Sequence, residues 1–282
     1  MMTLSRALLA GLCLAASTSV VHAAPKALKL TEADWRTPTP ETVMVIDTNK
    51  GRVLVELVPE VAPNHVARLQ DLTRAGLYDG RTFFRVIDRF MAQTGDPTNT
   101  GEGGSDRPNL KAEFTFRRAV DTGFVPMAAP AGLEVGLLKS LPVVSQNWSW
   151  SEVTSDKKVA AWATYCPGVI GMARSEDNNS ANSQFFLMRQ PYPSLDKRYT
   201  AFGRVISGLE AVRAIKTGEP VPAPQDLMQR VRLLSDIPES ERPKVRVIDP
   251  MGPWFAAETK RLRALNGADF SVCDIDLPVE VR

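Results

Sequence analysis

Residues 83–96 have the sequence Phe-Phe-Arg-Val-Ile-Asp-Arg-Phe-Met-Ala-Gln-Thr-Gly-Asp. Arg85 and Gln93 stand here among aromatic and aliphatic side chains that include Phe90 and Met91. Two fixed polar donors on an apolar surface are typical of a binding or catalytic pocket. A half-buried strand that points Arg85 and Gln93 into solvent fits the same pattern, so this segment alone leaves two alternatives open.

The sequence before this segment predicts a β-hairpin. Residues 43–46 and 52–57 are rich in Val, Ile and Leu, and residues 47–51 between them contain Asn and Gly, which accept the backbone conformations of a tight turn. An amphipathic helix should follow, beginning at Pro63 and ending near Gly76. His65 would lie in its first turn, solvated or partly covered and without a catalytic role.

The sequence after this segment predicts more strands and one further helix. Strands are expected at residues 168–173, 183–188, 199–205 and 231–234. The helix should run from Gly208 to about Thr217, with Ser207 as its N-cap. Many antiparallel strands with only two helices favour a closed barrel, because closure removes exposed sheet edges.

Residues 117–165 lose this periodicity and gather Gly, Pro, Ser and three tryptophans, Trp148, Trp150 and Trp162. The composition predicts a long inserted loop, part of which packs on the domain. Docking of a partner by Trp148 and Trp150 is the alternative.

The first 23 residues have the pattern of a secretory signal peptide. Arg6 precedes an apolar run at residues 7–16, and small residues surround an expected cleavage point after Ala23. The apolar run is shorter than the roughly 20 residues that a membrane-spanning helix needs. We therefore expect export to the periplasm and no membrane span after cleavage.

Cleavage would leave His65 as the only histidine, and Cys166 and Cys273 as the only cysteines. Histidine-activated nucleophiles and zinc sites then have no motif support, so neither a metal nor a cofactor is expected. Cys166 and Cys273 can form a disulfide or remain two buried thiols, which the sequence leaves open. A net charge of +2 without a basic patch does not favour nucleic-acid binding.

Residues 43–236 resemble the cyclophilin-type peptidyl-prolyl isomerases through four motifs in order. These are residues 83–87 with 90–96, then 168–173, then 183–186, and finally 195–196 with 202–205. The resemblance implies a mainly β fold, a closed eight-stranded antiparallel barrel capped by two α-helices, with the long inserted loop added. It divides the chain into a signal peptide (1–23), a linker (24–40), the isomerase domain (41–236, with the insertion at about 117–165) and a C-terminal extension (237–282).

The resemblance also implies a set of site residues. Arg85 and Gln93 match the catalytic pair. The expected substrate-binding residues are Phe90, Met91, Phe186 and Leu195 around the proline ring, Ala173, Arg174 and Gln184 along the preceding residues, and Tyr199.

The expected function is isomerisation of X-Pro peptide bonds, which would assist the folding of exported proteins. Its partners would be proline-containing segments of those proteins, and the enzyme is expected to be a monomer. A cyclophilin-like module or chaperone that binds such segments with little turnover is the alternative. Arg85 favours the enzyme, because a binding module needs no donor that acts only in the transition state.

Overall fold

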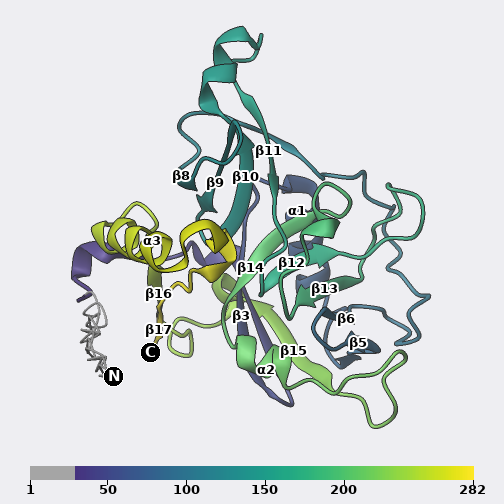
Figure 1. The fold of residues 1–282 in the computed structure, drawn as a ribbon. Helices are drawn as coiled ribbons and strands as arrows, with labels where there is room; N and C mark the ends of the chain where they lie inside the picture. The colour runs from purple at the N-terminus through teal and green to yellow at the C-terminus, as the bar shows by residue number, and fades with distance from the viewer. Residues whose placement is uncertain (1–28) are drawn as a thin grey trace, which may run out of the picture.

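The computed structural model describes residues 29–282, and its largest unit is a curled nine-stranded antiparallel sheet (Figure 1). The expected signal peptide, residues 1–23, lies outside the described residues. In hydrogen-bonded order the strands are β4 (Arg81–Thr82), β15 (Leu227–Leu233), β2 (Val43–Thr48), β3 (Gly51–Leu57), β14 (Ala201–Ser207), β12 (Val169–Met172), β13 (Phe185–Met188), β6 (Met91–Thr94) and β5 (Arg85–Ile87).

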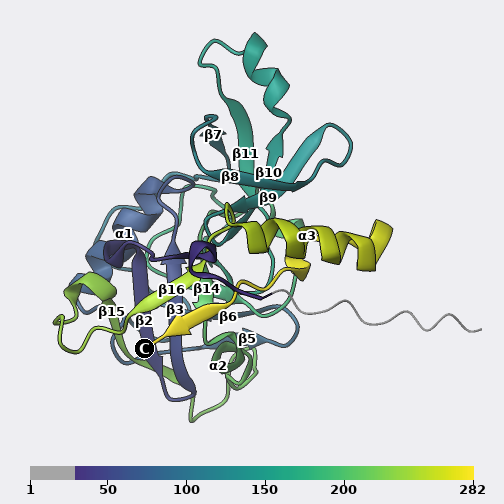
Figure 2. The same ribbon diagram turned by 90° about the vertical axis from the view of Figure 1, so that its left-hand side faces the viewer.

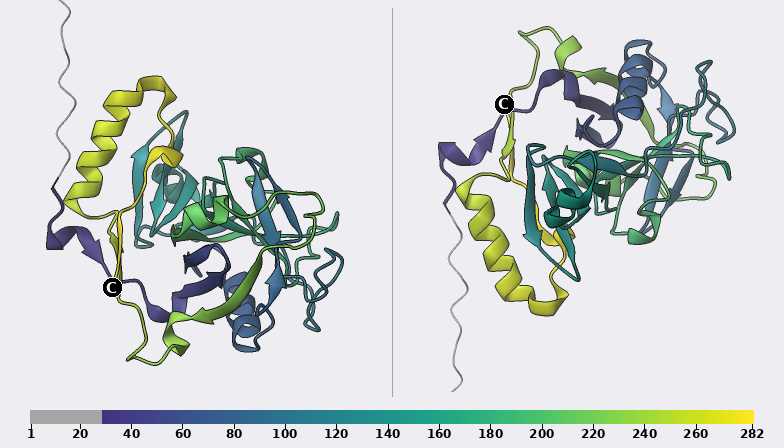
Figure 3. Two further views of the ribbon diagram at one scale, coloured as in Figure 1. Left: turned by 90° about the horizontal axis from the view of Figure 1, so that it is seen from below. Right: turned by 90° about the horizontal axis from the view of Figure 1, so that it is seen from above.

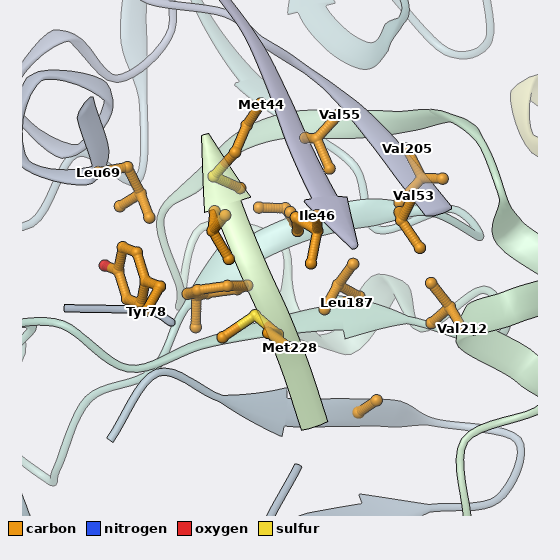
Figure 4. Packing of buried hydrophobic residues seen from close by; sticks show 14 of the residues in the cluster. Met44, Ile46, Val53, Val55, Leu69, Tyr78, Leu187, Val205, Val212 and Met228 are labelled. Carbon is orange, nitrogen blue, oxygen red and sulfur yellow. The ribbon is translucent and has the colours of Figure 1, made fainter. Parts of the chain in front are cut away.

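The predicted hairpin is present as β2 and β3, and two helices cover the core of the curled sheet. α1 (Pro63–Arg74) begins at Pro63, whose missing N–H costs nothing at a helix start, and the positive φ of Gly76 follows its end. α2 (Leu209–Arg213) is shorter than expected, and its N-cap is Gly208 instead of Ser207. Leu69 of α1 and Val212 of α2 lie on opposite sides of the buried cluster (Figure 4).

His65 is completely buried, so the expectation of a solvated or partly covered histidine is wrong. The carboxylate of Glu113 covers the first turn of α1, where it accepts hydrogen bonds from the backbone N–H groups of Asn64 and His65. Nδ1 of His65 lies 2.6 Å from Oε2 of Glu113. Burial raises the pKa of Glu113, but the hydrogen bonds from His65 and Asn64 outweigh this and place the pKa below its ordinary value.

The closed eight-stranded barrel is not confirmed. The sheet has nine strands, and among the described residues no strand pairing joins its two end strands, β4 and β5. The free edge of β5 is instead covered by residues 218–221. Val86 exchanges two backbone hydrogen bonds of 2.8 Å with Gly218, and Val221 N donates to Phe84 O. This segment satisfies backbone groups that an exposed edge strand would leave unpaired.

The insertion is a second sheet and not the long loop that the sequence predicted. Its strands, in hydrogen-bonded order, are β7 (Phe116–Arg118), β11 (Val159–Ala163), β10 (Leu141–Gln146), β9 (Leu133–Leu138) and β8 (Phe124–Ala128). The sheet stands out from the body of the molecule, and Trp148–Val153 forms a short helical turn at its far end (Figures 1 and 2). Leu137, Leu141 and Val143 of this sheet are buried in the same cluster as Phe186 of β13.

The ends of the described chain meet in a third sheet, in which β16 (Val245–Ile248) lies between β1 (Trp35–Arg36) and β17 (Val279–Val281). α3 (Pro253–Asn266) lies on the outside of the molecule beside the first residues of the described chain (Figure 3). A disulfide joins Cys166 to Cys273. None of the helices in residues 29–282 is long and apolar enough to cross a lipid bilayer.

Candidate functional site

Strand register brings Arg85, Gln93 and Phe186 into one row across the curled sheet. Arg85 on β5 pairs with Gln93 on β6, and Gln93 pairs with Phe186 on β13. Directly paired residues point to the same face of a sheet, with their Cβ atoms about 5 Å apart. Three side chains from separate strands are therefore neighbours on one face.

This row borders a cavity of about 180 Å³. Its lining contains nine of the ten residues expected in the site: Arg85, Phe90, Met91, Gln93, Ala173, Arg174, Phe186, Leu195 and Tyr199. The tenth, Gln184, lines a second cavity of about 360 Å³. The two cavities share Gln93, Ala173 and Arg174, so they adjoin.

The guanidinium of Arg85 is held at two of its three nitrogens. Nη1 donates to Oε1 of Gln93 at 3.3 Å, and Nε donates to Oε1 of Glu219 at 2.5 Å. The side chain of Arg85 is 37% exposed, which leaves its remaining N–H donors accessible from the cavity. Sequence reasoning missed Glu219, which is 134 residues from Arg85 in the chain.

Gln184 does not line the cavity that Arg85 borders, but it binds the side chain of Gln93, which does. Nε2 of Gln93 donates to Oε1 of Gln184 at 3.0 Å. Nε2 of Gln184 in turn donates to the carbonyl oxygens of Gly101 and Gly103, at 2.9 and 2.8 Å. Because both ends of the Gln184 amide are engaged, it fixes the amide of Gln93 with its oxygen toward Arg85.

The buried carboxylate of Asp96 organises the glycine-rich loop that supports Gln184. Its two oxygens accept hydrogen bonds from the hydroxyl of Thr98 and from the backbone N–H groups of Thr98, Thr100, Gly101 and Gly103. Burial raises the pKa of Asp96, yet these hydrogen bonds lower it by more, so the pKa lies below the ordinary value for aspartate.

Aromatic rings form much of the cavity wall. The ring of Phe186 lies 5.9 Å from that of Tyr165 in a stacked arrangement, and 5.9 Å from that of Tyr199 in an edge arrangement. Phe90 contacts Tyr192, with 4.5 Å between ring centres. Tyr165 and Tyr192 were missed from the sequence, because neither stands inside a motif. Burial raises the pKa of Tyr165 well above its ordinary value, so its hydroxyl stays neutral behind the wall.

Arg174 supplies a cation at the boundary between the two cavities. Its guanidinium lies 4.5 Å from the ring centre of Tyr199 and 5.7 Å from that of Phe114. It also donates to the carbonyl oxygens of Arg198 and Ser175. These contacts hold Arg174 against the rim, where its charge is partly exposed.

The geometry of the site suits electrostatic catalysis in an apolar cavity. Arg85 presents a permanent charge and a planar set of donors beside aromatic and aliphatic walls. His65, bound to Glu113, takes no part in lining the cavity. Within residues 29–282, no three His, Cys, Asp or Glu side chains are grouped as metal ligands would be.

Comparisons with known proteins cover most of the chain. The family model described as cyclophilin type peptidyl-prolyl cis-trans isomerase matches residues 43–235. A probable peptidyl-prolyl cis-trans isomerase of Brucella suis is 34% identical over 190 residues, which cover 64% of this chain and 74% of the relative. A peptidyl-prolyl cis-trans isomerase-like 1 of Aspergillus oryzae is 30% identical over 199 residues, covering 69% of this chain and 97% of the relative.

Among solved structures, the cyclophilin AquaCyp293 of Hirschia baltica superposes with a TM-score of 0.82 at 33% identity. The superposition covers 90% of this chain and 98% of that one, so the likeness extends beyond the residues that the family model matches. The chain belongs to the cyclophilin-type peptidyl-prolyl cis-trans isomerases.

Proposed function

We propose that the cavity beside Arg85 binds the proline ring of an X-Pro segment, and that Arg85 stabilises the twisted amide between its cis and trans forms. Rotation about this bond has a barrier of about 18–20 kcal/mol because amide resonance is lost. As the bond twists, the proline nitrogen regains a lone pair. A guanidinium that donates to this lone pair stabilises the transition state more than either ground state.

The convergence of Arg85, Gln93 and Phe186 on one cavity carries this proposal. Phe186 and the neighbouring wall residues Phe90, Met91 and Leu195 contact the proline ring and exclude water that would compete for the donor. Ala173 and Arg174, with Tyr199 beside them, flank the residues that precede the proline. Gln184 contributes by orienting Gln93.

We propose further that the substrates are proline-containing segments of exported proteins and that the enzyme works in the periplasm as a monomer. Two observations support the location. Residues 1–23 have the pattern of a cleavable signal, and the disulfide between Cys166 and Cys273 suits an oxidising compartment. Fractionation of the native host, with a blot for the processed chain, tests the location separately.

Arg85→Ala tests the catalytic role in a protease-coupled or exchange-spectroscopy assay on an Ala-Pro peptide. We expect kcat/KM to fall about 100-fold, the usual cost of removing one donor aimed at a developing charge. Arg52→Ala is the matched control, because Arg52 is an exposed arginine that pairs with Asp47 in the β2–β3 hairpin. That variant should retain the wild-type rate.

A titration of the same peptide separates the isomerase from the alternative. Peptide binding without isomerisation by the wild-type chain would identify a proline-segment binding module. Equal rates for wild type and Arg85→Ala would remove Arg85 from the mechanism.

A further inference from the structure

Glu219 reaches Arg85 from a segment that the rest of the site does not use. Residues 218–221 lie along the outer edge of β5, where Gly218 bonds to Val86 through both of its backbone groups and Val221 bonds to Phe84. These hydrogen bonds hold the backbone on both sides of Glu219. The carboxylate is therefore presented to Arg85 by a fixed piece of chain and not by a free loop.

Stability does not explain this ion pair. The side chains of Arg85 and Glu219 are 37% and 55% exposed. Ion pairs in contact with solvent contribute little to folding, because water screens the attraction and both side chains lose rotational freedom. Glu219 therefore binds Arg85 with little benefit to folding, which points to a role for this ion pair in the reaction.

The geometry indicates what this role is. Glu219 binds Nε and Gln93 binds Nη1, so the guanidinium plane is held from two directions. Nη2 has no hydrogen-bond acceptor among the described residues, and the side chain borders the cavity. Two acceptors on a planar fork fix its rotation and leave the remaining donors directed at the bound substrate.

We propose that Glu219 is a positioning residue, which holds the guanidinium of Arg85 in the orientation that donates to the twisted X-Pro amide. This inference rests on the proposed function of Arg85. Because the donor acts only in the transition state, loss of its orientation lowers kcat, while proline binding to the aromatic wall and hence KM are preserved.

The test compares Glu219→Ala and Glu219→Gln with wild type in the Ala-Pro peptide assay. We expect kcat to fall about 10-fold in Glu219→Ala with KM within about two-fold, since a misplaced catalytic group can cost up to about 100-fold. Glu219→Gln keeps an acceptor oxygen and should recover most of the rate. Glu239→Ala removes an exposed glutamate from outside the site and should match wild type.

A second measurement needs no substrate. The Nε–H resonance of Arg85, assigned with Arg85→Ala, should be protected from solvent exchange in wild type and lose this protection in Glu219→Ala. An unchanged rate and an unchanged resonance in Glu219→Ala, with activity still lost in Arg85→Ala, would overturn the positioning role and leave the proposed function standing. Full activity in Arg85→Ala would instead overturn both.

Discussion

Gly171 sets how deeply the ring of Phe186 can lie in the wall of the cavity. The two residues are paired directly between β12 and β13. A Cβ atom at position 171 would lie 2.5 Å from the ring of Phe186 and 2.6 Å from the hydroxyl oxygen of Tyr165, well inside van der Waals contact. Any larger residue would therefore push the ring of Phe186 into the space beside Arg85.

Asp96→Asn should destabilise the protein at neutral pH. The asparagine amide replaces one acceptor oxygen with a donor that faces backbone N–H groups, so we expect a loss of about 2–3 kcal/mol in the free energy of unfolding. Urea denaturation at pH 7 measures this loss. Asp106→Asn is the control, because the Asp106 side chain is 89% exposed. Equal midpoints for wild type and Asp96→Asn would contradict the role of Asp96 as organiser of the loop.

The same variant gives a pH dependence whose sign follows from the lowered pKa of Asp96. A carboxyl group whose pKa is lower in the folded state contributes its stability above the unfolded pKa, about 3.9 for aspartate. That contribution disappears as the pH falls through the folded pKa, which lies below the ordinary value. The difference in stability between wild type and Asp96→Asn should therefore be largest at neutral pH and shrink below about pH 4.

At this scale the sequence predicts the residues of the cavity and misses the contacts that orient them. Arg85, Gln93 and Phe186 stand in the short motifs that carry the resemblance to the cyclophilin-type isomerases, and the strand register of the structure places them on one face. The hydrogen bond from Gln93 to Gln184 spans 91 residues, and the bond from Arg85 to Glu219 spans 134. Both hydrogen bonds depend on the positions of loops in the folded protein, which the local periodicity of the sequence does not encode.

The strands of the insertion were also missed by the local sequence pattern. Pro126 lies in the edge strand β8, and Pro142 lies in β10, between β9 and β11. Proline removes a backbone donor and is found in sheets mainly in edge strands and at bulges, so prolines in this segment favoured a loop. Side-chain hydrogen bonds help to hold these strands together. Arg118 of β7 donates to Ser145 of β10 and to Glu134 of β9, which ties three strands together.

Arg118→Ala should weaken this sheet, because the change leaves the carboxylate of Glu134 without its partner in a largely buried position. We expect a loss of about 3 kcal/mol in the free energy of unfolding, within the range for breaking a buried ion pair. Urea denaturation followed by tryptophan fluorescence measures it, since the ring of Trp148 lies next to Arg118.

Arg117→Ala is the neighbouring control. Arg117 pairs with Asp156 at the surface, where both side chains are more than 40% exposed, so its loss should barely move the unfolding midpoint. Equal effects of the two variants would mean that the buried contacts of Arg118 do not hold the sheet.

For the molecule as a whole, the disulfide is the strongest single link between the tail and the body. Cys166 and Cys273 are 107 residues apart in sequence. Closing a loop of this length lowers the entropy of the unfolded chain and thereby raises the free energy of unfolding by about 4–5 kcal/mol. Reduction with dithiothreitol should lower Tm by about 10 °C, which calorimetry can measure. The double variant Cys166→Ala/Cys273→Ala should have the same Tm as the reduced wild-type protein, and dithiothreitol should not change it. A Tm that is the same with and without reductant would contradict this prediction.

The third sheet imposes an order on the folding of the protein. β1 needs β16 as its partner, and Asp34 beside it accepts a hydrogen bond from the backbone N–H of Trp254, 220 residues later. The core cluster between Met44 and Leu233 requires none of the late residues. The curled sheet can therefore form before the N-terminal segment has its partners, and β16 and β17 then complete the third sheet with β1.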